Sequence, residues 1–341
     1  MPIDTVFEKK NVLVTGGAGF IGSHLCESLL KDARVICLDN FTTSDVENIN
    51  HLLKNPDFEF IRHDINTPFD PENYPELSRF KIKFQGIQEL YHLACPTSPK
   101  KFDQYRLQTL YANSLGMRHT LDLAVKHKSR VVFTSTSVAY GHRPADGHLF
   151  KEEEFGTSDT LSPRACYDEG KRFAESFCQT YVNVHGIDVR IARVFRTYGP
   201  RMPLYDGQMI PDFITQALDG KDLEIYGDET FRTSLVFVDD IVDGLIKLMA
   251  TGDPLKVVNL GSDIDILLLD VARRIIEMTG SRSKVAFKPP LLFMSQLGLP
   301  DLTRAKERLG WIPLVTLDEG LKRTIEYAMA HKSLLSFRSI G

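Results

Sequence analysis

Tyr167 and Lys171 have the residue types and the spacing of a proton-transfer pair. They form a YxxxK pattern in the segment 164–185, whose apolar residues recur with the period of a helix. Residues four apart lie on one face of a helix, so the phenol and the ammonium group converge. A neighbouring cation favours the phenolate and is expected to lower the tyrosine pKa from about 10. The pair predicts a general base that acts on an alcohol while a hydride leaves the same carbon.

A hydroxyl-rich segment, TSTSVAYG at 134–141, strengthens this interpretation. It follows and partly overlaps an apolar run, Arg130–Ser135, that is typical of a strand. YxxxK alone is a common coincidence, so the prediction depends on both segments. The hydroxyl of Thr136 is the best candidate to hydrogen-bond the same substrate alcohol. Thr136, Tyr167 and Lys171 are therefore the predicted catalytic residues.

A glycine pattern, NVLVTGGAGFIGSHL, joins the predicted strand Val12–Thr15 to a helix at 20–31 through Gly16, Gly19 and Gly22. Glycines at such a turn let the backbone approach a pyrophosphate. The N-terminus of the following helix offers free N–H groups and a positive dipole end to that anion. The sequence therefore predicts a dinucleotide at this loop.

Asp39, at the end of the strand VICLDN, indicates which dinucleotide binds. An acid at this position accepts hydrogen bonds from both ribose hydroxyls and repels a 2′-phosphate. No Arg or Lys lies between Asp39 and Asn48 to bind such a phosphate, so NAD is expected rather than NADP. The predicted cofactor contacts are Gly16, Gly19, Phe20, Ile21, Gly22, Asp39, Asn40, Asp64, Ile65, Leu93, Ala94, Tyr167 and Lys171.

Strands and helices alternate through the first 200 residues, which predicts an α/β fold with a Rossmann-type doubly wound parallel sheet. The predicted strands are Val12–Thr15, Arg34–Leu38, Phe58–Ile61, Glu89–Leu93, Arg130–Ser135 and Val189–Phe195, and the predicted helices are 20–31, 44–54, 105–127 and 164–185.

A loop at Tyr198–Gly207, rich in Gly, Pro and Asp, interrupts the alternation. Shorter elements follow it and predict a smaller α+β domain. We expect residues 1–200 to form an NAD-binding domain that carries the catalytic residues. Residues 201–341 are expected to bind mainly substrate, with some exchange of chain between the two. The later elements are helices at 209–219, 239–250, 265–279, 302–309 and 317–331, strands at 223–226, 234–238 and 257–260, and a surface stretch at 288–300.

The composition excludes several classes of protein. The 341 residues include 41 Lys+Arg and 45 Asp+Glu, and a net charge of -4 argues against broad binding to nucleic acid or anionic lipid. No apolar stretch is long enough to span a bilayer, and the start MPIDTVFEKK has no signal-peptide core. The five cysteines and ten histidines show no metal-ligand spacing, so no metal is expected. A reduced, cytoplasmic setting fits this cysteine usage.

The chain resembles the extended short-chain dehydrogenase/reductase family over about residues 10 to 330. The matching segments are TGGAGFIG, LDN, HLA at 92–94, TSTSxxYG, YDEGK and YGP. Within that family, HLACPTSP at 92–99, RACYDEGKR at 164–172 and RVFRTYGPRM at 193–202 are most similar to UDP-glucuronate decarboxylases. The resemblance implies a tightly held NAD that is reduced and reoxidised within one turnover. It also implies a UDP-sugar substrate and a homodimer formed through the helices 105–127 and 164–185.

The resemblance also implies a reaction. Tyr167 would take the proton of the sugar 4-hydroxyl while C4 gives its hydride to NAD. The resulting 4-ketone lies β to the C6 carboxylate, so loss of CO2 leaves an enolate that protonation and return of the hydride convert to UDP-xylose. The substrate contacts that the resemblance implies are Pro96, Ser137, Arg196, Gln208, Tyr226 and Arg232.

Three positions depart from the decarboxylase pattern. Val138 stands where TSTSEVYG has a catalytic glutamate, and valine transfers no proton. Arg196 replaces an asparagine that contacts the sugar-linked diphosphate; it is expected to meet a phosphate, a substrate carboxylate or a structural ion-pair partner. Thr233 replaces an arginine, and Arg232 is its neighbour on a strand, where a one-residue shift reverses the side that faces the substrate.

Two alternatives stay open. A UDP-hexose or UDP-hexuronate 4-epimerase needs only Thr136, Tyr167 and Lys171, and it tolerates Val138. A non-catalytic NAD-binding sensor would keep the glycine loop without needing the Tyr–Lys pair, which is present here. A 4,6-dehydratase is disfavoured, because that chemistry uses an Asp–Glu pair where this chain has Ser137 and Val138.

Overall fold

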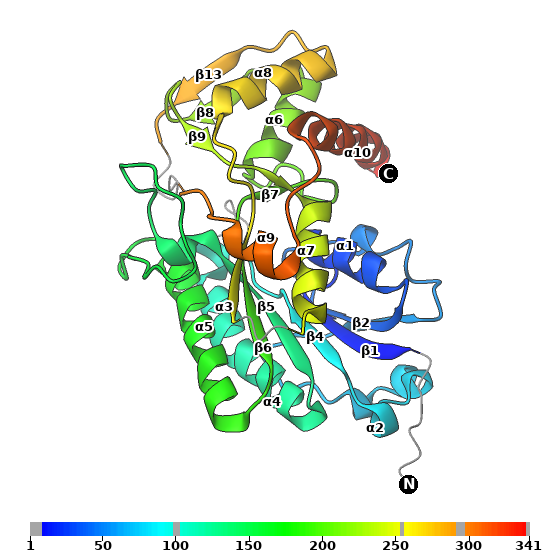
Figure 1. Ribbon diagram of the computed structural model, residues 1–341. Helices are drawn as coiled ribbons and strands as arrows, with labels where there is room; N and C mark the ends of the chain where they lie inside the picture. Colours follow the sequence, from blue (N-terminus) through cyan, green and yellow to red (C-terminus); the bar gives the residue numbers. More distant parts are fainter. Residues whose placement is uncertain (1–8, 98–102, 253–255, 291–296, 339–341) are drawn as a thin grey trace.

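The computed structural model describes residues 9–97, 103–252, 256–290 and 297–338. Its centre is a seven-stranded sheet in the order β11-β6-β5-β4-β1-β2-β3, and every neighbouring pair is parallel. This order confirms the predicted doubly wound fold (Figure 1). The strands are β1 Lys10–Thr15, β2 Ala33–Asp39, β3 Phe58–Arg62, β4 Glu89–His92, β5 Arg130–Thr136, β6 Val189–Val194 and β11 Val257–Leu260.

Helices cover both faces of this sheet because its strands are apolar on both sides. On β1, Val12 and Val14 pack in one core cluster with Leu25 of α1 and residues of α7. Leu13 points the other way and packs with Leu121 of α4 and residues of α5. The helices of these layers are α1 Phe20–Leu29, α2 Ile82–Gln85, α3 Arg106–Tyr111, α4 Met117–His127, α5 Ala165–His185 and α7 Val238–Ala250.

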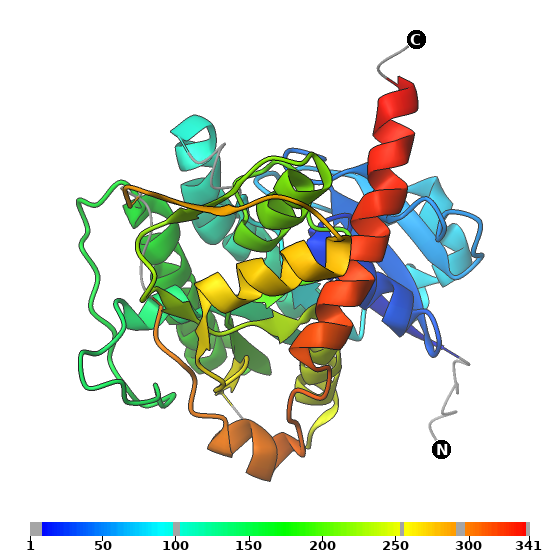
Figure 2. The same ribbon diagram turned by 90° about the horizontal axis from the view of Figure 1, so that it is seen from above.

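Most of the remaining elements form a smaller assembly beyond the carboxyl ends of the strands (Figures 1 and 2), while α9 Thr303–Leu309 packs against β11 and α7. Three two-stranded ladders join β8 to β13, β9 to β12 and β7 to β10. These elements are β7 Thr197–Tyr198, α6 Met209–Leu218, β8 Leu223–Tyr226, β9 Arg232–Thr233, β10 Val236–Phe237, β12 Ile266–Leu267, α8 Leu268–Thr279, β13 Val285–Lys288, α9 Thr303–Leu309 and α10 Leu317–Arg338. No helix in the described ranges combines the length and the apolar character needed to cross a membrane. Part of the predicted surface stretch 288–300, residues 291–296, lies outside the described residues.

Three predicted elements differ from the structure. The helix expected at 44–54 is wrong, because only Val46–Asn48 forms a 3-10 turn. The side chain of Asn48 is buried there and donates to the carbonyl oxygen of Ala18. The helix expected at 105–127 is interrupted by a π-helical turn at Ala112–Gly116, between α3 and α4. Of the strand expected at 234–238, only Val236–Phe237 forms a strand, β10, and Val238 begins α7.

Two later elements complete the main sheet and one of its helical layers. β11 pairs with β6, with Val257 opposite Ile191. Leu245 and Leu248 of α7 are fully buried in the same cluster as Val12 and Val14 of β1. The chain therefore returns to the main sheet after it has formed the first elements of the smaller assembly.

Candidate active site

The glycine turn after β1 brings the backbone of three segments together. Gly16 has φ +70° and its N–H donates 2.8 Å to the carbonyl oxygen of Leu38. A Cβ atom at Gly16 would lie 2.8 Å from the backbone of Ala94, and one at Gly22 would overlap the carbonyl oxygen of Gly16. Only glycine fits this cradle, and Gly19 is the N-cap of α1. The free N–H groups of α1 therefore face a space that suits a pyrophosphate.

Asp39 is almost fully buried at the end of β2, where its carboxylate is held in place. Oδ2 accepts from the N–H of Ala18 at 3.1 Å, and Oδ1 accepts from the N–H of Phe41 at 2.9 Å and from the hydroxyl of Ser44 at 2.7 Å. Asp39 and Asn40 line the same cleft as the glycine turn. Ser44 was not anticipated from the sequence, and it orients the carboxylate that ribose hydroxyls would contact.

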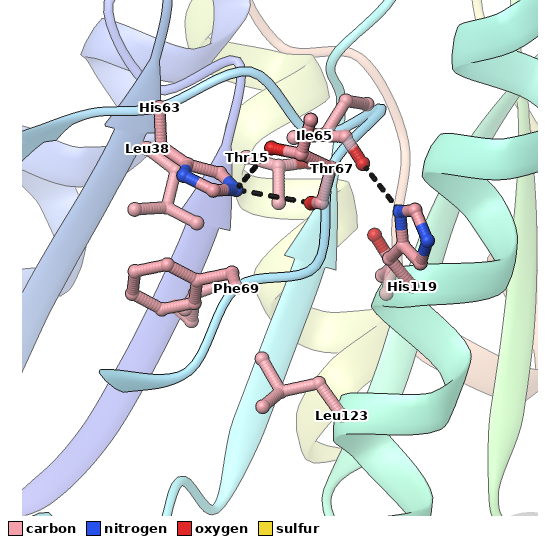
Figure 3. A pocket seen from close by; sticks show the side chains of 10 residues that line it. Thr15, Leu38, His63, Ile65, Thr67, Phe69, His119 and Leu123 are labelled. Atoms are coloured by element: carbon pink, nitrogen blue, oxygen red, sulfur yellow. Dashed lines mark hydrogen bonds between the residues drawn. The ribbon is translucent and has the colours of Figure 1, made fainter. Parts of the chain in front are cut away.

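Two histidines fix the segment that carries Asp64 and Ile65. The ring of His63 lies 3.1 Å from the carbonyl oxygen of Thr67, and Nδ1 of His119 lies 3.1 Å from the carbonyl oxygen of Ile65. Figure 3 shows both contacts around a cavity of about 10 Å³, the size of one water molecule. The segment is thereby held with Asp64 and Ile65 on the wall of the main cleft.

The predicted catalytic residues meet where β5 ends against α5. Lys171 is buried, its Nζ donates 2.9 Å to the carbonyl oxygen of Thr134, and it lies 4.8 Å from the ring centroid of Phe133. The hydroxyl of Thr136, the last residue of β5, lies close enough to Tyr167 to lower the pKa of its phenol. The YxxxK helix and the hydroxyl-rich strand end therefore converge as their sequence patterns indicate.

The electrostatics of Tyr167 differ from the sequence-based expectation. Burial raises the pKa of Tyr167 and the Cys95 thiol raises it further, while the Thr136 hydroxyl and the charge of Arg164 lower it. Burial also lowers the pKa of Lys171. The expected lowering by Lys171 is wrong for this structure, because the ammonium group is directed to the carbonyl oxygen of Thr134 and desolvation dominates.

One cleft of about 920 Å³ collects nearly all of the predicted site residues. Arg232 is the exception, since it is absent from the lining of this cleft. Its Nε donates 2.7 Å to Asp265, which also accepts from Arg143 at 2.7 Å. The predicted residues that do line the cleft are Gly16, Gly19, Phe20, Ile21, Gly22, Asp39, Asn40, Asp64, Ile65, Leu93, Ala94, Pro96, Thr136, Ser137, Tyr167, Lys171, Arg196, Gln208 and Tyr226.

Arg196 occupies the cleft without an acidic partner. The one contact of its guanidinium in the described residues is from Nη1 to Sδ of Met209 at 3.7 Å. Burial and the neighbouring charge of Arg164 lower the pKa of Arg196 to about 10. The structural ion pair considered from the sequence is not formed among the described residues.

Two further residues were missed: Arg164, beside Tyr167, and Asn113, which packs against Gly170 of α5. The guanidinium carbon of Arg164 lies 5.9 Å from the ring centroid of Tyr167, and Nη2 lies 3.5 Å from Oδ1 of Asp168. Asn113, in the π-helical turn, is buried and donates to the carbonyl oxygen of Thr109, while its Oδ1 has no partner in the described part of the chain. Arg164 could have been found from the sequence, because it opens the segment RACYDEGKR. Asn113 could not, because a π-helical turn has no pattern that is recognisable in one sequence.

Val138 lines the cleft from the 3-10 turn Ser137–Tyr140, and it is 5% exposed. Its N–H donates 3.4 Å to the hydroxyl of Thr136. An apolar side chain at this position offers no proton donor or acceptor to a ligand.

The sheet order, the glycine cradle and the buried acid at the end of β2 define a dinucleotide-binding Rossmann protein. Residues 12–261 match the NAD dependent epimerase/dehydratase family, and the chain belongs to this family. Its cofactor is NAD, and the fit of Gly16, Gly22 and Asp39 around α1 agrees with that requirement.

Curated relatives and solved structures give the same family. The chain is 38% identical over 321 residues to UDP-glucuronic acid decarboxylase 1 of Danio rerio, covering 94% of this chain and 73% of that protein. It is 37% identical over 312 residues to UDP-glucuronic acid decarboxylase 5 of Arabidopsis thaliana, covering 91% and 86%.

Among solved structures, a UDP-glucose 4-epimerase of Thermotoga maritima with UDP-glucose aligns with a TM-score of 0.81 at 30% identity, over 95% of this chain and 99% of that one. A UDP-glucuronic acid 4-epimerase of Bacillus cereus, in complex with UDP-glucuronic acid and NAD, aligns with a TM-score of 0.81 at 28% identity, over 94% and 99%.

Proposed function

We propose that this protein modifies a UDP-sugar by transient oxidation at C4, and that UDP-glucuronate decarboxylation is its reaction. The convergence of Thr136, Tyr167 and Lys171 in the cleft that also holds the glycine cradle and Asp39 is the observation that carries this proposal. The similarity to UDP-glucuronic acid decarboxylases over more than nine-tenths of the chain supports the substrate.

Each catalytic residue has a role that follows from its contacts. Tyr167 takes the proton of the sugar 4-hydroxyl, and the nearby hydroxyl of Thr136 hydrogen-bonds and orients that substrate hydroxyl. Lys171, anchored to β5, supplies positive charge beside the developing phenolate. Bound NAD supplies the hydride acceptor and, later in the same turnover, the hydride donor.

The remaining steps follow from the substrate. Once C4 is a ketone, the C5–C6 bond breaks and releases CO2, and its electron pair passes into the C4 carbonyl as an enolate. A proton from solvent water then adds to C5, and return of the hydride to C4 gives UDP-xylose. The Tyr167 hydroxyl returns its proton to O4 in that last step, so the residue ends the cycle unchanged.

A 4-epimerase is the second candidate, and Val138 is the observation that favours it. A buried valine on the cleft wall transfers no proton to C5, whereas epimerisation needs only oxidation, rotation of the ketone and reduction from its other face. The aligned 4-epimerase structures support this alternative. A non-catalytic NAD sensor is a remote third candidate, because the Tyr–Lys pair is intact.

The cofactor and substrate have separate parts of the cleft. The cofactor-binding role of the predicted residues from Gly16 to Ala94 rests on their common position around α1 and at the ends of β2, β3 and β4. Residues 1–200 thus carry the NAD site and the catalytic residues, and residues 201–341 mainly bind the nucleotide sugar. For the sugar nucleotide we assign Pro96, Ser137, Arg196, Gln208 and Tyr226, and Arg232 only if it leaves its bond with Asp265.

The dimer expected through the helices 105–127 and 164–185 is also a proposal. Large apolar side chains on these helices are exposed, among them Leu107 at 60% and Phe173 at 50%. A second copy packing on the same face would bury them as a symmetric four-helix contact. All five cysteines are free, which fits the cytoplasmic location that we propose.

Incubation of the purified protein with UDP-glucuronate, followed by mass spectrometry and NMR of the product, tests the reaction. Loss of CO2 establishes decarboxylation in spite of Val138. A product of unchanged mass with a new NMR spectrum establishes epimerisation. Unchanged UDP-glucuronate rules out this substrate.

A further inference from the structure

Two arginines lie together on the wall of the cleft next to the predicted base. Arg164 reaches from the N-terminal end of α5 and places its guanidinium carbon 5.9 Å from the ring centroid of Tyr167. Arg196 lies two residues beyond Val194, which is paired with Thr136 across β5 and β6, and it lines the same cleft. Arg164 has an acidic partner at 3.5 Å, Asp168, whereas the described residues offer no carboxylate to Arg196.

The position of Arg196 is costly without a ligand. A guanidinium keeps its charge at physiological pH and carries five N–H donors. Holding it half-buried next to a second cation is unfavourable unless an anion satisfies it. The thioether of Met209 is only a weak acceptor. The arrangement therefore suits an anionic group of the ligand, bound in the two-pronged geometry that arginine favours.

The location beside Tyr167 indicates which anion this is. If the hydroxyl of Tyr167 contacts the 4-hydroxyl, the group attached to the neighbouring C5 lies at the same end of the sugar. In a hexuronate that group is the C6 carboxylate. The diphosphate is attached to C1, on the opposite side of the sugar ring.

We propose that Arg196 is a specificity-determining residue that pairs with the C6 carboxylate and selects UDP-hexuronates over neutral UDP-hexoses. Arg164, held by Asp168, supports this pairing by adding positive potential at the same end of the cleft. The assignment rests on the proposed C4 chemistry, since that chemistry places the sugar. Arg196 thereby does something different from the asparagine expected at its position.

Binding measurements separate this role from the alternatives. NAD-loaded protein carrying Tyr167→Phe, which blocks turnover, is titrated calorimetrically with UDP-glucuronate, UDP-glucose and UDP. We expect UDP-glucuronate to bind more tightly than UDP-glucose. Adding Arg196→Gln should weaken UDP-glucuronate binding by at least about tenfold and change the affinities for UDP-glucose and UDP by less than about twofold.

Arg196→Lys should retain part of the preference for UDP-glucuronate, because it keeps the charge without the two-pronged guanidinium. Arg273→Gln, which removes an exposed arginine on α8, should change none of the three affinities.

Three outcomes would overturn the assignment. Equal weakening for all three ligands places Arg196 on the diphosphate, and no weakening makes it structural. Equal affinity of the parent protein for UDP-glucuronate and UDP-glucose removes the selectivity itself. Turnover of the protein with native Tyr167 on either sugar is a separate readout, so failure of this inference is distinguishable from failure of the C4 chemistry.

Discussion

Lys171 on α5 donates a 2.9 Å hydrogen bond from Nζ to the carbonyl oxygen of Thr134 on β5. This bond ties the helix that carries Tyr167 to the strand that ends at Thr136. The hydroxyls of Tyr167 and Thr136 therefore already lie side by side. Positioning of this kind is what a general base requires, because its oxygen must already lie within reach of the proton that it takes.

Replacing Tyr167 with Phe removes only the proposed base. We expect turnover to fall by at least about 100-fold, while the amount of NAD that copurifies is unchanged. Product formation and cofactor content by chromatography are the measurements. Tyr327→Phe removes a hydroxyl on α10 and should keep full activity. Full activity of the Tyr167 variant would mean that another group takes the proton.

Replacing Asp39 with Ala should weaken NAD binding by about tenfold or more, because hydrogen bonds to a charged acceptor are lost. The measurement is the cofactor content of purified protein, followed by titration with NAD. Since Asp39 also accepts from Ala18 and Ser44, thermal unfolding of the cofactor-free variant reports any structural loss separately. Asp45→Ala, at an exposed 3-10 N-cap, is the matched control. Unchanged NAD content in the Asp39 variant would refute its role.

We expect the buried side chain of His92 to make the free energy of unfolding depend on pH. Burial, together with the smaller effect of the charge of Lys171, lowers the pKa of His92 to about 3. Between about pH 6.5 and that value the unfolded chain binds a proton that the folded chain does not, so stability is full above this window and falls as the pH decreases. The slope from this group is about 1.4 kcal/mol per pH unit.

Urea unfolding at several pH values measures this slope. His92→Gln should flatten the dependence by about one proton relative to the parent protein. His185→Gln, at the exposed end of α5, serves as the comparison. An unchanged slope in the His92 variant would show that its side chain does not resist protonation in the folded state.

If the proposed dimer exists, substitutions in its interface should halve the molecular mass of the particle in solution. Leu107→Glu or Phe173→Glu places a charge on the apolar face of α3 and α5 and should shift the protein from dimer to monomer in sedimentation experiments. Phe84→Glu changes a residue of α2 that is 81% exposed, and it should leave the dimer intact. A parent protein that sediments as a monomer would contradict the proposed interface.

Local chemistry made it possible to predict from the sequence the residues to which we assign catalytic and cofactor-binding roles. A Cβ atom at Gly16 would press on the backbone of Ala94, so this position requires glycine. The sequence shows such a constraint as a pattern of glycines after a strand. The spacing of Tyr167 and Lys171 on one helix is also a local property. These features need no knowledge of distant contacts.

Tertiary packing decided the features that the sequence did not predict. The side chain of Asn48 donates a hydrogen bond to Ala18, and a 3-10 turn stands where a helix was expected at 44–54. Arg232 is directed to Asp265, 33 positions away, so its absence from the cleft follows from a partner that strand pattern alone does not identify. The pKa of Tyr167 likewise depends on burial by several elements rather than on its neighbour Lys171.

The most direct test of the account uses UDP-glucuronate carrying deuterium at C4 in ordinary water. If the hydride leaves C4 and returns within one active site, the product retains deuterium at C4, whether it is UDP-xylose or the C4 epimer. NMR and mass spectrometry of the product read the label, and the Tyr167→Phe variant should form no product. Product that has exchanged the label for hydrogen, or bound substrate that is never converted, would contradict transient C4 oxidation.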